Sequence, residues 1–284
     1  MINPTDLGIG LRPKHYQEIL NFQQGSIQSQ LRGLNYMEVI VENYLNPQSV
    51  GYQKLKTIAC SYPIVGHGVT LNLAGSDPLN QDYLDQVKTL VKDFSMPYTS
   101  DHLCWSSTGQ RQHHDLLPAP YHSSLIPYIA ERAAYVQGYL GIPFGIENLS
   151  SYLTWTYDEM SEWEFYNRVI QESGCWYMLD INNIYVSSRN HGFKAEDYLK
   201  SIEWDRVLQV HLAGHQVLET GMHHDTHDRA VSQGVWDLYC LAWEIGGPFP
   251  TLIEWDENIP PLSRVINELS LAQKLRSQIQ IRNE

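Results

Sequence analysis

Short apolar segments recur along the chain and are separated by longer amphipathic stretches. The segments are near-continuously hydrophobic, as parallel strands covered on both faces tend to be. Eight segments have this character: 8–12, 36–43, 64–69, 98–104, 144–149, 175–181, 207–214 and 251–256.

Helical spacing appears between these segments, most clearly over 83–94, 125–140 and 262–275, where apolar residues return every three or four positions. Turn residues such as Gly141 and Gly174 precede the next apolar segment. The alternation predicts an α/β fold, a (β/α)8 TIM barrel, and a length of 284 residues suits one such domain over 1–284. A doubly wound open sheet is the alternative, but its strands would not aim so many polar residues at one point.

Metal-capable side chains lie at or near the ends of the predicted strands. The carboxyl ends of barrel strands converge on one mouth, so we expect these side chains to gather there as a polynuclear metal site. Imidazole and carboxylate donors without thiolate suit iron, manganese or zinc in an open catalytic site. A carboxylate that bridges two cations is needed to hold them close together. Glu147, on the fifth of the eight predicted strands, is the expected bridging residue. The residues concerned are His67, His102, Glu147, Asp180, His211 and Glu254.

The long segment after the seventh predicted strand carries the sequence DTHD. The spacing of Asp225 and His227 predicts that both side chains lie on one side of an extended segment that reaches back over the mouth. Other polar residues nearby are expected to be exposed or to lie in loops: His223, His224, Asp228, His113, His114 and Asp115.

Composition limits the class of protein. Hydrophobic residues make up 43% of the chain and charged residues 18%, and no apolar stretch approaches the ~18 residues of a membrane span. The start of the chain has no apolar region behind a basic one, so a cytoplasmic location is expected. The scattered Cys60, Cys104, Cys175 and Cys240 favour reduced thiols over a disulfide framework or a zinc ribbon.

The charge balance bears on partners. The net charge is −13, from 19 basic and 32 acidic residues, and there is no basic run with which to neutralise phosphates. Nucleic acid is therefore an unsuitable partner.

Neither 8–12 nor 141–145 forms a GxGxxG loop that opens a helix, so no flavin or nicotinamide is expected.

A set of motifs now indicates a family. Their order and number are specific, and they run from Gly8 to the final predicted helix. Together they resemble the multinuclear non-heme iron-dependent oxidative enzymes, a branch of the xylose-isomerase-like barrels. The motifs are GLR, EVIVENYL, GHGVTLNLAGSDPL, SDHLCW, HDLLPAPY, IENLSSYL, MLDINNIYVSS, HLAGH, DTHD and IEWDENIP.

The resemblance implies two or three iron ions, Fe(II) or Fe(III), with dioxygen as co-substrate. The implied ligands are His67, His102 and Glu147 for the first ion; Glu147, Asp180, His211 and Glu254 for the second; and Asp225, His227 and Asn183 for a third. Because Asn183 stands where related barrels often place a histidine, the third position is expected to be the weakest. Glu147, Asp180 and His215 are the expected catalytic residues.

Supporting roles are also expected around the mouth. His215 would support the ligands or face the substrate, and Asp101 and Asp256 would orient imidazoles. Further expected residues are Arg12 as partner of a buried carboxylate, Glu42 and Asn43 as polar lining, and Trp105, Tyr121, Tyr152, Trp155 and Tyr185 as an aromatic rim.

Members of the family are similar in oxidising cysteine residues of ribosomally made precursor peptides. The resemblance therefore implies a cysteine-containing peptide substrate and a small, separate peptide-recognition partner protein. Two alternatives stay open: a zinc- or manganese-dependent hydrolase or isomerase on the same barrel, and a non-enzymatic metal-binding protein. Metal content and peptide-dependent oxygen use distinguish them.

Overall fold

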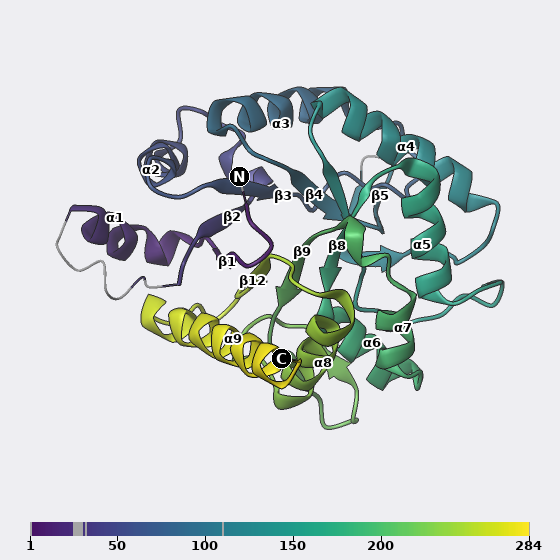
Figure 1. Ribbon diagram of the computed structural model, residues 1–284. Coiled ribbons are helices and arrows are strands. Elements are labelled where there is room, and N and C mark those ends of the chain that lie inside the picture. Colours follow the sequence, from purple (N-terminus) through teal and green to yellow (C-terminus); the bar gives the residue numbers. More distant parts are fainter. Residues whose placement is uncertain (1, 25–30, 32, 110, 284) are drawn as a thin grey trace.

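Parallel strands at the centre of the molecule close into a barrel (Figure 1). This computed structural model describes residues 2–24, 31, 33–109 and 111–283. The predicted (β/α)8 barrel is confirmed, and each of the eight predicted apolar segments overlaps a barrel strand. Around the barrel the strands are β1 (Leu7–Gly10), β2 (Tyr36–Ile40), β3 (Ile64–His67), β4 (Thr99–His102), β7 (Phe144–Glu147), β8 (Trp176–Asp180), β9 (Val207–Leu212) and β12 (Thr251–Ile253).

Strand register places polar residues of neighbouring strands side by side. His102 on β4 pairs with Glu147 on β7, and Asp180 on β8 pairs with His211 on β9. Because side chains alternate along a strand, residues two positions apart share the barrel interior. The last inward-facing side chains of the strands therefore lie in one layer at the mouth of the barrel.

Helices surround the strands, as Figure 1 shows. The three helical patterns predicted from spacing are confirmed as α3, α4 and α9, and α4 and α5 end at Gly141 and Gly174 in the left-handed conformation that glycine favours. The helices are α1 (Tyr16–Gln24), α2 (Val50–Ala59), α3 (Gln81–Phe94), α4 (Leu125–Leu140), α5 (Glu162–Ser173), α6 (Ile181–His191), α7 (Ala195–Ser201), α8 (Gln233–Gly246) and α9 (Leu262–Asn283).

Two hairpins interrupt the regular alternation. β5 (Cys104–Thr108) pairs antiparallel with β6 (Arg111–Pro118), and β10 (Gln216–Val217) pairs with β11 (His223–His224). The expectation that His113, His114 and Asp115 lie in a loop is therefore wrong, because β6 carries all three residues. The sequence of β6, RQHHDLLP, is mostly polar, so it lacks the apolar run by which the barrel strands were recognised.

Apolar packing closes the barrel below the mouth. A small buried cluster combines Tyr36, Val65, Tyr98, Met178 and Leu252. Val65, Met178 and Leu252 each precede by two positions a polar residue at the mouth, as the alternation of side chains requires. The larger core lies between the strands and the helices. No helix in the described part of the chain has the length and apolar character needed to cross a bilayer.

Candidate metal centre

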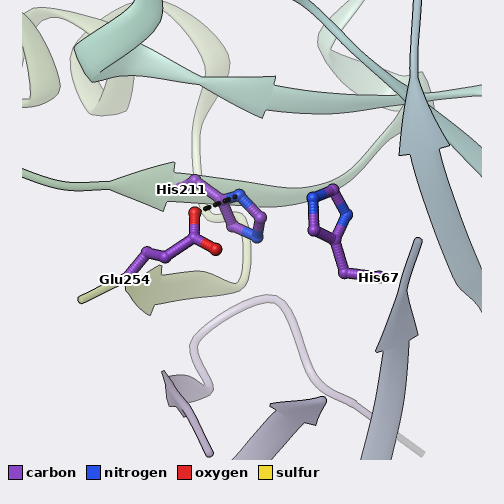
Figure 2. A group of neighbouring side chains, drawn as sticks. All are labelled: His67, His211 and Glu254. Carbon is purple, nitrogen blue, oxygen red and sulfur yellow. Dashed lines mark ion pairs between the residues drawn. The ribbon is translucent and has the colours of Figure 1, made fainter. Parts of the chain in front are cut away.

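Buried imidazoles and carboxylates meet at the mouth of the barrel. Their potential ligand atoms lie within 4.8 Å of one another in each of four overlapping groups. Figure 2 shows one group, in which the ring of His211 lies between the carboxylate of Glu254 and the ring of His67. The groups are His67, His211 and Glu254; His67, His102 and Glu147; Glu147, Asp180 and His211; and Asp180, His227 and Glu254.

Glu147 lies at the centre of this arrangement, at the end of β7. Its Oε2 atom is 3.0 Å from Nε2 of His67, 3.7 Å from Nε2 of His102 and 3.6 Å from Nδ1 of His211. The carboxylate is 1% exposed, and its Oε2 atom accepts no hydrogen bond. One oxygen atom thus faces three imidazole nitrogens, as a bridging ligand would.

Glu254 and His227 extend the cluster to the other side of the mouth. Glu254 Oε2 is 3.3 Å from Nδ1 of His211 and 3.4 Å from Nδ1 of His227. The Nε2 atom of His227 is 4.0 Å from Oδ2 of Asp180. His227 therefore shares its group with Asp180 and Glu254.

Several buried polar atoms of the cluster have no hydrogen-bond partner. A polar atom left unpaired inside a protein costs about 1–3 kcal/mol, and more when it is charged. A cation placed among these atoms would satisfy them together, and the donor set contains imidazole and carboxylate without thiolate. The residues therefore fit a divalent transition metal. The atoms are Glu147 Oε2, Asp180 Oδ2, His211 Nδ1, His227 Nε2 and Asn183 Oδ1, of which Glu147 Oε2, Asp180 Oδ2, His211 Nδ1 and His227 Nε2 take part in ion pairs.

Burial and charge together shift the protonation of this cluster. Burial opposes the charged form of His102, but Glu147 and Asp101 outweigh it and raise the pKa of His102 to about 9. Burial also opposes ionisation of Glu147, but three neighbouring imidazoles hold its pKa well below the usual range. At Asp180 burial dominates and raises the pKa of the carboxyl. Without a cation, the carboxylates at the mouth are compensated by protonated histidines.

Hydrogen bonds outside the cluster orient its side chains. His67 contacts Ser100 Oγ through Nδ1 at 2.8 Å, and His102 contacts the Gly68 carbonyl through Nδ1 at 3.1 Å, so that each ring presents Nε2 to Glu147. Asp180 caps α6: its Oδ1 accepts from the Asn183 backbone N–H at 2.7 Å and its Oδ2 stays available.

The DTHD segment brings its two candidate ligands together in an unexpected way. Asp225 Oδ1 is 2.7 Å from His227 Nε2. The backbone at His227 has a φ of +45°, so the segment is not extended at that residue, although the two side chains lie together as expected. Nearby, the Asn183 amide donates to the Asn148 carbonyl at 3.0 Å and leaves its Oδ1 without a partner. The ligand roles of Asp225, His227 and Asn183 stay predictions.

His215 lies outside the four groups but is connected to them. Its Nδ1 is 2.8 Å from Oδ1 of Asn182, whose amide donates to Asp225 at 2.6 Å. Burial, assisted by His223, lowers the pKa of His215 to about 4. His215 is therefore neutral at pH 7, and its catalytic role stays a prediction.

Arg12 and Asp256 occupy the places expected for them. Arg12 is buried and forms ion pairs with Glu254, at 3.4 Å, and with Asp256. Asp256 Oδ2 is 3.0 Å from Nδ1 of His227 and so orients this imidazole. Both expectations are confirmed.

Asp101 and Glu42 also accept hydrogen bonds from the loop after β3, and the supporting roles expected for them stay predictions. Asp101 Oδ1 lies 3.8 Å from Nδ1 of His102, farther than the Gly68 carbonyl, and its carboxylate accepts backbone N–H groups of Leu71 and His102. Glu42 likewise accepts from Val69, Thr70 and Tyr83 and so supports the loop after β3.

The aromatic residues expected at the rim divide into two sets. Trp105 and Trp155 lie 6.5 Å apart between ring centroids, and Tyr152 contacts His224 at 5.7 Å. Tyr121 and Tyr185 instead pack against the main core. The first set links the β5–β6 hairpin, the loop after β7 and the β10–β11 hairpin.

Sequence reasoning missed Glu38 and Gln209. Both are buried inside the barrel, and Glu38 Oε1 lies 3.0 Å from Nε2 of His211. Gln209 precedes His211 by two positions on β9, so the alternation of side chains was the available signal for it.

Solved structures share the fold at low sequence identity. A D-tagatose 3-epimerase-like protein matches with a TM-score of 0.60 and 12% identity over 98% of this chain and 100% of that one. A xylose isomerase domain protein from Planctomyces limnophilus gives a TM-score of 0.60 and 12% identity over 98% of each chain. These matches confirm the xylose-isomerase-like barrel and show the fold alone.

Sequence relatives cover nearly the whole chain. A UPF0276 protein of Acaryochloris marina is 41% identical over 265 residues, which are 93% of this chain and 92% of that protein. A UPF0276 protein of Caulobacter vibrioides is 38% identical over 274 residues, 96% of this chain and 95% of that protein. Residues 6–277 match the family model described as "RiPP precursor modification enzyme MbnB/TglH/ChrH". The chain belongs to this family of enzymes that modify ribosomally synthesised precursor peptides, and the resemblance read from its motifs is confirmed.

Proposed function

We propose that this protein is a multinuclear iron enzyme that uses dioxygen to oxidise cysteine residues of a ribosomally synthesised precursor peptide. The observation that carries the proposal is the set of buried imidazole and carboxylate atoms that face one another at the mouth of a barrel, several of them without a hydrogen-bond partner. Membership of a family of precursor-modifying enzymes supports a peptide as the substrate.

Two overlapping ligand sets share Glu147 in this proposal. His67 and His102 complete one set, while Asp180, His211 and Glu254 complete the other. His227, with Asp225 and Asn183, would hold a third ion. Bound iron would supply the one-electron redox chemistry that reaction with dioxygen requires. Because the proposed ligand residues are buried, access of water to the ions through the interior of the barrel would be restricted.

His215 is proposed to face the substrate and to accept a hydrogen bond from it. The Asn182 amide donates to Asp225, so its Oδ1 points to His215 and must accept the Nδ1 proton of that ring. This leaves Nε2 of His215 unprotonated, and its pKa of about 4 keeps it so at neutral pH. A thiol or an amide N–H of a bound peptide would donate a hydrogen bond to this nitrogen and so be positioned.

The peptide is proposed to cross the mouth along the aromatic side chains of Trp105, Trp155 and Tyr152, which offer apolar faces for an extended segment. The chain is proposed to work as a single cytoplasmic domain, with leader recognition by a small, separate partner protein. A partner binding beside these aromatic residues would present the peptide to the metal centre.

The test combines metal analysis with peptide chemistry. Protein purified without oxygen is analysed for metals and then given a cysteine-containing peptide encoded beside its gene. We expect iron at two or three ions per chain, peptide-dependent oxygen consumption and a changed peptide mass. Zinc with hydrolysis of phosphodiesters, isomerisation of sugars, or metal uptake without peptide-dependent oxygen use would each contradict the proposal.

A further inference from the structure

A chain of buried polar side chains lies inside the barrel below His211. Glu38 on β2, Gln209 on β9 and Tyr98 before β4 are 2%, 0% and 4% exposed. Barrel interiors are mostly filled by branched apolar residues, and a buried carboxylate is unfavourable unless hydrogen bonds compensate it. The presence of Glu38 here therefore requires a physical explanation.

Hydrogen bonds fix the orientation of this chain. The Tyr98 hydroxyl donates to Oε1 of Gln209 at 2.7 Å, which turns the Gln209 amide nitrogen toward Glu38. That nitrogen donates to Oε2 of Glu38 at 2.7 Å. The other neighbour of the carboxylate is Nε2 of His211, 3.0 Å from Oε1 and 3.2 Å from Oε2.

These contacts decide which nitrogen of His211 carries the proton. A carboxylate can only accept, so Nε2 of His211 donates to Glu38. Nε2 of Gln209 and Nε2 of His211 then both donate to the Glu38 carboxylate, and for this reason the two nitrogens lie only 2.8 Å apart. Nδ1 is left as the metal-facing nitrogen, 3.6 Å from Glu147 Oε2 and 3.3 Å from Glu254 Oε2.

We propose that Glu38 is a positioning residue that holds His211 in the tautomer and ring orientation that present Nδ1 to the metal, with Gln209 and Tyr98 fixing the carboxylate. The inference rests on the metal centre of the proposed function, but not on iron, dioxygen or peptide. Metal-binding histidines commonly donate their second N–H to such a partner, and losing the partner costs about 10–100-fold in metal affinity.

Zinc titration of metal-free protein against a competing chelator tests the role. In Glu38→Gln, an amide offers one acceptor oxygen to two donors, so we expect zinc to bind about 10–100-fold more weakly. Glu268→Gln is the matched control, because Glu268 is also a buried carboxylate but pairs with Arg264 on α9. Thermal unfolding of each variant monitors folding separately.

A charge swap distinguishes positioning from packing. The double variant Glu38→Gln/Gln209→Glu exchanges the two side chains. It returns a carboxylate to the neighbourhood of His211 Nε2 and keeps one amide and one acid among the buried polar residues. We expect it to recover at least part of the zinc affinity. A packing role alone would leave the single variant and the double variant equal.

Nitrogen NMR of zinc-loaded, ¹⁵N-histidine-labelled protein gives the direct readout. We expect the His211 signal, identified by its loss in His211→Gln, to show a protonated Nε2 and a metal-bound Nδ1. Zinc bound through Nε2, or unchanged affinity in Glu38→Gln, would overturn the inference and leave the proposed function standing. Wild-type protein that binds no zinc would overturn both. Normal zinc results without peptide oxidation would overturn the proposed function alone.

Discussion

The Oε2 atom of Glu147 lies 3.0 Å from Nε2 of His67, and it accepts no hydrogen bond. This carboxylate, at the end of β7, also faces His102 on the neighbouring strand β4 and His211 on β9, which lies beyond β8 on the other side. A single residue therefore connects the two proposed ligand sets.

Replacement of Glu147 by glutamine should lower the metal content at two positions together. The amide keeps the size of the side chain but loses the charge that offsets two adjacent cations. We expect metal analysis to show a loss of up to two ions per chain, with peptide oxidation abolished. Glu268→Gln, distant on α9, should keep full metal content. A loss of a single ion in Glu147→Gln would contradict the bridging assignment.

His227→Ala should remove only the proposed third ion. His227 contacts Asp225, Asp180 and Glu254 but belongs to none of the groups that contain His67 or His102. We expect the metal content to fall by one ion while the set around His67 stays occupied. Comparison with Glu147→Gln in the same metal assay checks this. Equal loss in the two variants would show that the sites are not separable.

Metal binding should stabilise the protein, because a cation relieves the unpaired atoms at the mouth. A ligand at 100 times its Kd adds about 2.7 kcal/mol to the free energy of unfolding. At this chain length we expect a rise in Tm of roughly 4–5 °C. Thermal unfolding with divalent metal and then with excess chelator measures it. Glu147→Gln should show a smaller rise, and an unchanged Tm in wild type would argue against the site.

Much of this centre could be predicted from sequence because parallel strands end in polar residues at one mouth. His67, Glu147, Asp180 and His211 each terminate or nearly terminate an apolar run, His102 ends the polar strand β4, and the structure brings all five together. Both faces of a barrel strand are covered, so an apolar run marks a strand without telling which of its residues point inward.

Because an apolar run does not show which residues point inward, the sequence did not predict the position of Glu38. It lies in the middle of β2 between Met37 and Val39, and the sequence does not distinguish a position inside the barrel from one facing the helices. The position of His227 was hidden for another reason: its contact with Asp180 and Glu254 depends on a left-handed backbone, which only the folded loop imposes.

Stability should fall in acid through His215. Its pKa of about 4 in the fold lies below the ordinary value of 6.5, so as the pH falls the unfolded chain takes up the proton first. The stabilisation is fully present above pH 6.5 and is lost as the pH falls to about 4; it amounts to at most ~3 kcal/mol.

Denaturant unfolding of metal-free protein between these pH values checks the contribution of His215. His215→Gln keeps an N–H donor for Asn182 but cannot take up a proton, so its stability should depend less on pH. His122→Gln, at a partly exposed imidazole that pairs with Glu159, should retain the wild-type slope. An equal pH slope in wild type and His215→Gln would refute the assignment.

Gly214→Ala should disturb the metal centre without touching a ligand. A Cβ atom at Gly214 would overlap the backbone carbonyl oxygens of Arg229 and Ala230, in the segment that follows His227. The backbone must move to admit the methyl group, at a cost of about 1–3 kcal/mol, and His227 would move with it. We expect a loss of the ion that His227 is proposed to hold and a lower Tm. Gly138→Ala is the matched control, because its Cβ meets open space on α4 and should stabilise the helix by about 0.5–1 kcal/mol with full metal content. Full metal content in Gly214→Ala would show that the position of His227 does not depend on this contact.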